Sequence, residues 1–488
     1  MSQKLTSQSP MTNYRWTICA MLFFATTVNY LDRQVLSLTW KDFIAPEFHW
    51  TDAHYGDITA FFSIAYALST LVAGRFIDKI GTKKGFLWAI GIWSVGACLH
   101  ALCGVVTQMW TGYEGAAALE AVKSGSAAAF AIASVSTYAF IVARFVLALG
   151  EAGNFPGAIK VVAEYFPKRD RAFATAIFNT GASVGALVAP LSIPLIARYF
   201  KNIGFGGGWE MAFLIIGALG FVWMGFWVFV YDKPTESAKV NEAELEYIMQ
   251  DEAEAQEATS PQEAEPSISF MKCLTYRQTW AFIVGKFMSD GVWWFFLFWT
   301  PAYISDVYGY TSDSGMGMVS IFVIYLITML SIYGGKLPSI IMNKSSKDPY
   351  AARMQAMLIF AFFPLLALFA QPLGEVSIWL PVIIIGIVGA AHSSWAANIY
   401  STVSDMFPKS SVGTIIGIGT TAGGVSSFLI NKGSGMLFTY ADETSMQFMG
   451  FEGKPAGYFI IFIICSVSYL VGWCIMKLLV PRYAPIRG

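Results

Sequence analysis

Charged side chains are scarce in this sequence. They make up 13% of its 488 residues, whereas 56% of the residues are hydrophobic, and ordinary soluble domains carry about a quarter charged residues. The composition therefore excludes a soluble globular protein. Runs of about 20 apolar residues can cross a bilayer as helices, and we count twelve, at about 16–40, 55–77, 85–106, 136–165, 171–199, 209–231, 278–304, 314–335, 353–371, 377–404, 411–438 and 455–480. Since a helix satisfies its own backbone polar groups in lipid, the sequence predicts an all-α polytopic membrane protein with twelve transmembrane helices.

Signals of several other protein classes are missing. No small-residue cleavage site follows the first apolar run, so we expect a retained helix rather than a signal peptide. The six cysteines have no ligand spacing, so neither a disulfide framework nor a metal site is indicated. We find no phosphate-cradling loop or nucleophile elbow, and the net charge of -1 gives no sign of a nucleic-acid partner. We therefore expect no enzyme, no cofactor and no nucleic acid, and a monomer in the lipid bilayer.

The basic residues predict an orientation. If the N-terminus is cytoplasmic, the loops and tails on that side carry 21 of the 31 Lys and Arg residues, and those on the other side carry six. Cytoplasmic loops of membrane proteins have an excess of Lys and Arg, so both termini are expected in the cytoplasm. The remaining four basic residues lie within predicted spans: Arg33, Arg144, Lys160 and Lys286. A charge there costs at least ~2.5 kcal/mol unless it is partnered or hydrated.

The chain divides into two halves. Residues 232–277 are polar and acidic, which is typical of a solvated linker with a short helix. This linker separates a predicted N-terminal six-helix bundle, 1–231, from a C-terminal one, 278–488. The halves look related, because EYFPK at 164–168 and DMFPK at 405–409 each follow an apolar span and precede a Gly-rich one. Repeated six-helix halves favour an alternating-access transporter with its site near the midplane, although a duplication of packing helices would leave the same pattern.

A short motif follows the second span. The sequence GRFIDKIGTKK resembles the signature of the corresponding loop in the major facilitator superfamily, and its matching positions are Gly74, Asp78, Gly81, Lys83 and Lys84. The resemblance implies the major facilitator fold of two pseudo-symmetric six-helix bundles. An acid near a helix end and a basic pair after a Gly turn can form a breakable charge network, so these residues are predicted to form a cytoplasmic gate. The topology rule alone would also account for the two lysines.

Longer stretches resemble the anion:cation symporter family, and within it the hexuronate (galacturonate and glucuronate) transporters. They are NYLDR at 29–33, residues 143–190, residues 288–304 and the stretch that begins at His392. The similarity leaves out the termini, the linker and an insertion at 107–136, to which we assign no role. The resemblance implies a secondary active transporter of the bacterial inner membrane that imports a sugar acid or a similar organic anion together with protons.

Two carboxylates are predicted at a similar depth in the membrane. Asp32 lies 16 residues after Trp16, at the start of the first span, and Glu151 lies 15 residues before Phe166, just past the end of the fourth. Arg144 and Glu151 are seven residues apart, which is two helical turns, so they share one face. One interpretation is a structural ion-pair network, for instance Asp32 with Arg144 or Arg33 with Glu151.

The other interpretation of these charges is functional. An arginine holds a carboxylate through its planar fork of donors. A substrate anion that competes with an internal carboxylate for the same arginine would couple substrate binding to proton uptake. The resemblance implies that Arg33 is the substrate ligand and that Asp32 and Glu151 are the protonatable pair. Arg144 is then the internal partner that tunes Glu151.

Polar and aromatic residues complete a predicted sugar site. Those at the family's binding positions are Tyr30, Tyr66, Asn179, Ser393, Ser394 and Asn398, and flat faces for a sugar ring come from Trp293, Trp294 and Trp395. Each polar residue alone is more often an interhelical hydrogen bond, and Trp299 is interpreted as packing. Weaker candidates are Lys286 and Asp290, which are four residues apart and can neutralise each other, and His392, which can titrate near neutrality or simply pack.

Other functions are open from the sequence alone. The runner-up is a proton- or sodium-coupled carrier or exchanger of another organic anion, such as galactonate, tartrate or an acidic amino acid. A transporter-like membrane sensor is a rival class, but a sensor would usually have an added soluble domain, and no loop exceeds about 45 residues.

Overall fold

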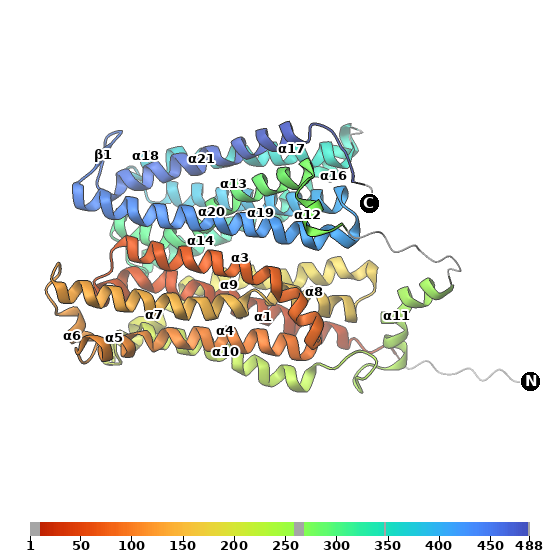
Figure 1. Cartoon of the computed structure of the whole chain (residues 1–488), viewed down its shortest axis with the longest axis horizontal. Helices are drawn as coiled ribbons and strands as arrows, with labels where there is room; N and C mark the ends of the chain where they lie inside the picture. The colour runs from red at the N-terminus through yellow and green to blue at the C-terminus, as the bar shows by residue number, and fades with distance from the viewer. Residues whose placement is uncertain (1–9, 258–267, 346–347, 487–488) are drawn as a thin grey trace, which may run out of the picture.

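The computed structural model describes residues 10–257, 268–345 and 348–486, and helices make up nearly all of it. The helices gather in two bundles that lie side by side (Figure 1). The first bundle comprises α1 (Tyr14–Thr39), a π-helical turn (Trp40–Ile44), α2 (Ala45–Phe48), α3 (Asp52–Ile80), α4 (Thr82–Ala101), α5 (Cys103–Thr111), α6 (Ala116–Glu120), α7 (Ala127–Glu151), α8 (Asn154–Tyr165), α9 (Lys168–Asn202) and α10 (Trp209–Val230).

The second bundle begins after α11 (Glu242–Glu257). It comprises α12 (Phe270–Cys273), α13 (Arg277–Tyr308), α14 (Gly315–Thr328), α15 (Ser331–Gly334), α16 (Leu337–Ser345), α17 (Pro349–Phe362), a 3-10 turn (Phe363–Phe369), α18 (Ala370–Gly374), α19 (Trp379–Met406), α20 (Lys409–Thr444) and α21 (Lys454–Leu479). A short antiparallel pair, β1 (Gln447–Phe448) and β2 (Phe451–Glu452), precedes α21. The predicted all-α class is confirmed.

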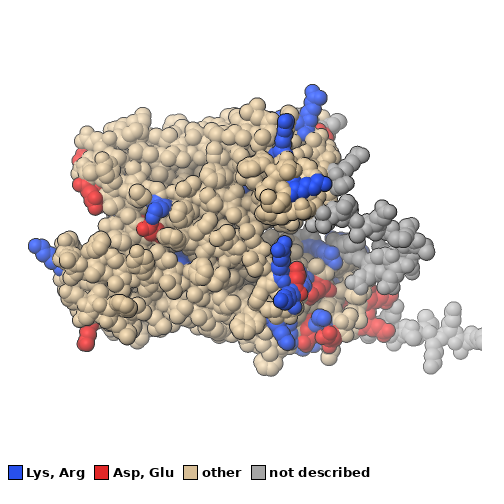
Figure 2. Space-filling view, in the orientation of Figure 1, with Lys and Arg blue, Asp and Glu red and all other residues tan. Residues whose placement is uncertain are grey.

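Length and hydropathy single out ten spans within the described residues, or eleven if the bent pair of α4 and α5 counts as one. α1 is not among them, because Asp32, Arg33 and other polar residues lower its hydropathy. It is nevertheless 26 residues long and packs against α9 and α10, so together these helices occupy the twelve predicted positions. Most of the side surface seen in Figure 2 carries no charge, and Lys and Arg side chains gather toward one end of the molecule.

That end carries α11 and the start of α1, and we call it the linker end; the opposite end is the far end (Figure 1). The predicted short helix of the linker is present as α11, but its Glu244 is not solvated as predicted. This side chain is fully buried, and its carboxylate accepts a hydrogen bond from Arg15 Nη1 at 2.9 Å. The ion pair fixes α11 against α1. Residues 258–267 of the predicted linker lie outside the described residues.

The predicted insertion at 107–136 forms the end of α5, α6 and the start of α7 at the far end. His49 Nε2 donates a hydrogen bond to the carbonyl oxygen of Leu119 at 2.9 Å, and Trp50 Nε1 donates to Ser136 Oγ at 2.8 Å. The insertion therefore packs over the connection between α1 and α3.

The two bundles meet most extensively where α3 packs against α20. Gly435 allows this approach at the far end, because a Cβ there would lie 2.5 Å from the carbonyl oxygen of Asp52 and 2.9 Å from Gly56 Cα. Further toward the middle, Ser427 Oγ donates to Ser63 Oγ at 2.8 Å. The interface between the halves is therefore tight from the far end to the centre of the molecule.

Candidate functional site

Arg33 and Glu151 form a buried ion pair in the first bundle. Arg33 Nε and Nη2 both donate to Glu151 Oε2, at 2.9 and 2.7 Å, and the two side chains are 5% and 0% exposed. Glu151 is the last residue of α7, which packs backbone to backbone against α4. A Cβ on Gly150 would lie only 2.2 Å from the backbone nitrogen of Trp93.

Three aromatic rings surround Arg33. Its Cζ atom lies 5.2 Å from the ring centroid of Tyr30, 4.7 Å from that of Tyr66 and 5.3 Å from that of Trp294. A guanidinium is attracted to an aromatic face within about 6 Å. Trp294 belongs to α13, so both halves contribute to the surroundings of Arg33. The structure therefore brings together four residues of the predicted substrate site at the interface of the bundles.

Asp32 and Arg144 lie next to this pair. Both carboxylate oxygens of Asp32 are buried, and neither has a hydrogen-bond partner among the described residues. Arg144 Nη2 donates to the backbone carbonyl of Arg33 at 3.3 Å, and its Cζ lies 4.9 Å from the ring centroid of Phe62. Of the two ion pairs that the sequence left open, the structure forms the one between Arg33 and Glu151. Arg144 makes no hydrogen bond to Glu151, whose Oε2 is taken by Arg33 and whose Oε1 has no partner among the described residues.

A second buried ion pair lies in the second bundle. Lys286 Nζ is 2.7 Å from Asp290 Oδ2, and it also donates to the hydroxyl of Tyr400 at 2.9 Å. The lysine and aspartate side chains are 6% and 11% exposed. The predicted mutual neutralisation is thus present in the structure. Tyr400 was not predicted, because its contact with Lys286 joins helices 114 residues apart and follows from no local spacing.

His392 makes packing contacts. Its Nδ1 atom is 2.7 Å from the hydroxyl of Tyr469, and its ring stacks on Trp293 with the ring centroids 5.0 Å apart. Tyr469 in turn donates to the backbone carbonyl of Ser289 at 3.2 Å. These contacts lie within the second bundle and agree with the packing interpretation of the histidine.

The other predicted sugar-site residues make contacts within their own helices or bundle. Ser394 Oγ donates to the backbone carbonyl four residues earlier at 2.8 Å, and Asn398 Nδ2 donates to that of Ser394 at 2.8 Å. Trp395 is fully buried and packs edge-on against a tyrosine of α21. Asn179 is exposed, and Ser393 is half-buried.

The chain also resembles known proteins over most of its length. The sequence profile of the Major Facilitator Superfamily matches residues 22–430. The chain belongs to this superfamily. The hexuronate transporter of Escherichia coli (strain K12) is 26% identical over 408 residues, which cover 83% of each chain. The probable galactarate/D-glucarate transporter GarP of the same strain is 24% identical over 462 residues, or 93% of this chain and 95% of the relative. The expectation of a membrane transporter, not an enzyme, is thus confirmed.

Solved structures of the superfamily share the fold. A bacterial homologue of the human lysosomal transporter Spinster, inward-facing and unoccupied, superposes with a TM-score of 0.70 at 16% identity and covers 97% of this chain and 100% of its own. A D-xylose-proton symporter superposes with a TM-score of 0.65 at 13% identity, over 97% and 98% of the two chains. At these identities the likeness concerns the fold alone.

The superfamily signature around Asp78 lies at the linker end of the first bundle. Gly81 joins α3 to α4 with a φ of 90°, which favours glycine. Asp78 accepts a hydrogen bond from Lys160 Nζ at 2.8 Å, and Lys83 Nζ donates to Asp232 Oδ1 at 2.9 Å. Both pairs hold neighbouring segments of the first half together, and neither reaches the second bundle. They are partly exposed, so each contributes little to stability.

An ion cluster at the far end crosses between the bundles. Lys41 Nζ is 2.7 Å from Asp306 Oδ1, and Lys454 Nζ is 2.8 Å from Asp52 Oδ2. Asp42 also accepts hydrogen bonds at 2.7 Å from two serines of the second bundle. No sequence pattern predicted this cluster, because its partners come from opposite halves of the chain. It closes the far end around the tight contact of α3 with α20.

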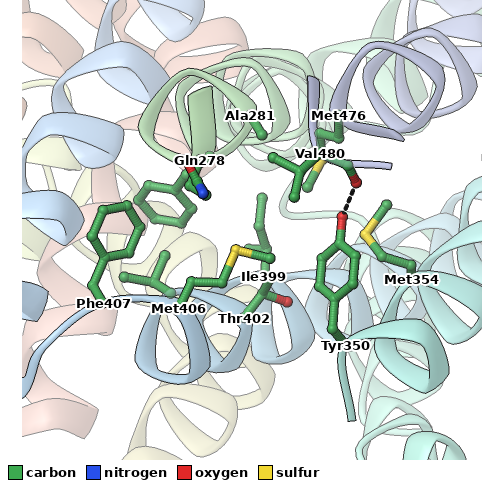
Figure 3. Close-up of a pocket in the computed structure, with 12 residues that line it drawn as sticks. Gln278, Ala281, Tyr350, Met354, Ile399, Thr402, Met406, Phe407, Met476 and Val480 are labelled. Carbon is green, nitrogen blue, oxygen red and sulfur yellow. Dashed lines mark hydrogen bonds between the residues drawn. The ribbon is translucent and has the colours of Figure 1, made fainter. Parts of the chain in front are cut away.

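A small pocket in the second bundle is separate from these charges. It lies among α13, α17, α19 and α21, and Gln278 and Thr402 are polar residues in its wall (Figure 3). Tyr350 donates a hydrogen bond to the backbone carbonyl of Val480 at its edge. Its volume of about 20 Å³ leaves room for about one water molecule. The pocket is too small and too apolar for a sugar acid.

Proposed function

We propose that this transporter imports a sugar acid, in the first instance a hexuronate, by proton symport. The observation that carries the proposal is the pair of Arg33 and Glu151, a buried guanidinium that binds carboxylates and an internal carboxylate that occupies it. The relatives named above are hexuronate and galactarate/D-glucarate transporters, and this supports a sugar acid as the substrate.

Competition for Arg33 couples the substrate to the proton. A substrate carboxylate needs the same Nε and Nη2 donors that Glu151 now uses. Once displaced, a buried Glu151 carboxylate is costly unless it takes up a proton. Protonation of Glu151 and binding of the anion therefore favour each other, and loss of the proton returns Glu151 to Arg33 and expels the substrate. Asp32, buried beside the pair, is the second protonatable group, and Arg144 sets the local field for both acids.

The aromatic residues around Arg33 fit a sugar ring. Tyr30 and Tyr66 supply hydroxyl groups, and Trp294 supplies a flat face from the opposite half. We assign a lesser part in binding to the residues whose present contacts are local: Asn179, Trp293, Ser393, Ser394, Trp395 and Asn398.

Transport proceeds by alternating access in this proposal. Residues 1–231 and 278–488 move as two units, joined by residues 232–277. We place the linker end and both termini in the cytoplasm, because the excess of Lys and Arg at that end obeys the positive-inside rule (Figure 2). The ion cluster at the far end then closes the outer side, and residues Gly74, Asp78, Gly81, Lys83 and Lys84 act as the inner gate when they engage the second bundle.

The test is uptake of labelled galacturonate into proteoliposomes. An imposed proton gradient should drive accumulation in sodium-free buffer, and a protonophore should abolish it. Uptake that ignores the protonophore but stops when sodium is removed would instead support a sodium-coupled carrier. Counterflow without response to either gradient would support an exchanger.

A further inference from the structure

Each half of the molecule carries one buried ion pair of the same kind. Arg33 and Glu151 lie in the first bundle at 2.7 Å, and Lys286 and Asp290 lie in the second, also at 2.7 Å. Both cations contact tyrosine rings: Arg33 lies over Tyr66, and Lys286 Nζ lies 4.6 Å from the ring centroid of Tyr400. The proposed function uses only the first pair.

The two pairs approach the interface of the bundles from opposite sides. Trp294, which covers Arg33, is eight residues beyond Lys286 on α13, so their Cα atoms are separated by about 12 Å along the helix at 1.5 Å per residue. Tyr400 accepts a hydrogen bond from Lys286, and Trp294 covers Arg33 from the same helix that carries Lys286. α13 therefore links the surroundings of the two cations.

A substrate with a single carboxylate can engage only one of the two cations, Arg33 or Lys286. A hexuronate places its carboxylate at Arg33 and a neutral end toward Lys286, whereas a sugar acid with a carboxylate at each end can engage both cations. The side chains of Arg33 and Lys286 are long, and they shorten the gap that an extended six-carbon chain must bridge. A buried lysine without an anionic partner is costly, so an anion must replace Asp290 whenever that acid is neutralised.

We propose that Lys286 binds a second carboxylate of the substrate, so that the transporter prefers sugar diacids to monoacids. This inference rests on the proposed function of Arg33 and refines its substrate class. Asp290 plays the part in the second half that Glu151 plays in the first, because it gives up its cation to the substrate.

Space around Asp290 is consistent with this role. Its carboxylate packs against Gly423 of α20, where a Cβ would lie 2.2 Å from Oδ2, and Ser289 Oγ donates to Oδ1 at 3.4 Å. The absence of a side chain at Gly423 leaves room for the carboxylate beside Lys286. The serine hydroxyl remains as a neighbour when Asp290 leaves the lysine.

The test compares two acids of equal chain length, galacturonate and galactarate, by binding to the purified protein and by counterflow. Wild type should bind galactarate more tightly than galacturonate. Lys286→Gln should lower the affinity for galactarate at least tenfold and leave that for galacturonate nearly unchanged. Asp290→Asn, which keeps the lysine, should retain galactarate binding. The matched control is Lys432→Gln, since Lys432 pairs with Asp57 in a more exposed ion pair between the bundles.

The outcomes separate the two proposals. Equal affinity of wild type for both acids, or a parallel loss of both in Lys286→Gln with an unchanged Tm, would overturn the role of Lys286 and leave the proposed function standing. If Lys286→Gln does not fold, the preference of wild type for galactarate and the retention of galactarate binding in Asp290→Asn decide the matter. Binding of neither acid to wild type would overturn the proposed function and this inference together.

Discussion

Arg33 and Glu151, 118 residues apart in the chain, are joined by two hydrogen bonds that end on the same carboxylate oxygen of Glu151. Both donors of Arg33 end on Oε2, and Oε1 has no hydrogen-bond partner among the described residues. A bidentate fork would instead use both oxygens. In the observed geometry Oε1 can take up a proton while Oε2 still faces the guanidinium. Proton uptake and the release of Arg33 can thus be two separate steps.

The first prediction concerns Glu151→Gln. Glutamine resembles protonated Glu151 in size, and it leaves the Arg33 donors available to the substrate. Counterflow of galacturonate should persist, but proton-driven accumulation should fall to the level of empty liposomes, because the variant has no proton to release. The measurement is both assays in the same proteoliposomes, with Tm as the control. Parallel loss of both activities together with a lower Tm would show a purely structural pair, since a stranded buried arginine costs about 3 kcal/mol or more.

The second prediction concerns Arg33→Lys. Lysine keeps the charge but loses the planar fork and most of the contact with three aromatic rings. Affinity for galacturonate should fall at least tenfold, or about 1.4 kcal/mol, with little change in expression. Arg353→Lys is the matched control, because Arg353 forms an ion pair with Asp405 at the linker end of the second bundle. Wild-type affinity in Arg33→Lys would remove Arg33 from the substrate site.

The third prediction concerns the closure of the far end. Asp306→Asn removes the nearer acidic partner of Lys41 and leaves Asp52 to pair with both Lys41 and Lys454, so the far end should open more often. In a cysteine-free background, Ser63→Cys places a thiol in the buried contact of α3 with α20. Its labelling by a membrane-impermeant maleimide should become several-fold faster in Asp306→Asn. Asp57→Asn is the control, because the ion pair of Asp57 with Lys432 is more exposed than this cluster. Equal labelling rates in the Ser63→Cys background, in Asp306→Asn and in Asp57→Asn would contradict the gating role of the cluster.

The fourth prediction is a pH dependence of stability that arises at Glu47, in the connection between α1 and α3. Burial raises the pKa of Glu47 from 4.5 to about 8, and Glu210, Glu120 and Lys201 are the charged groups around it. The folded protein therefore holds a proton that the unfolded chain loses, so stability should fall as the pH rises from about 4.5 to about 8. Glu47→Gln should flatten this part of the curve of Tm against pH. Identical slopes in the variant and wild type would place the effect elsewhere.

The helical architecture could be predicted from the sequence because it depends on local composition. The apolar runs located the long helices, but the ends differ: α7 begins at Ala127 in a stretch that is itself apolar, and α20 continues through polar residues to Thr444. The shared depth of Asp32 and Glu151 followed from counting residues along helices. The spacing of four between Lys286 and Asp290 likewise predicted a contact that the structure contains.

The pairing of side chains from different helices could not be predicted in the same way. The sequence allowed Arg33 to pair with Glu151 but gave no reason to prefer that pair, since helix rotation and side-chain reach decide it. It also did not reveal Tyr400 as the partner of Lys286, or the cluster of Lys41 with Asp306, because each contact joins distant segments. The strongly acidic composition around Glu244 predicted a solvated segment, so the buried contact of Glu244 with Arg15 could not be expected from it.

The polar character of α1 has a consequence for the synthesis of the protein. Asp32 and Arg33 lie on a helix that hydropathy alone does not identify as a span, and each charge at the centre of a helix raises the apparent free energy of insertion by about 2.5–3.5 kcal/mol. The partner of Arg33 emerges from the ribosome only 118 residues later. We therefore expect the first helix to settle stably in the bilayer only when α7 brings Glu151 to Arg33, so that biogenesis of the first half is cooperative and not sequential.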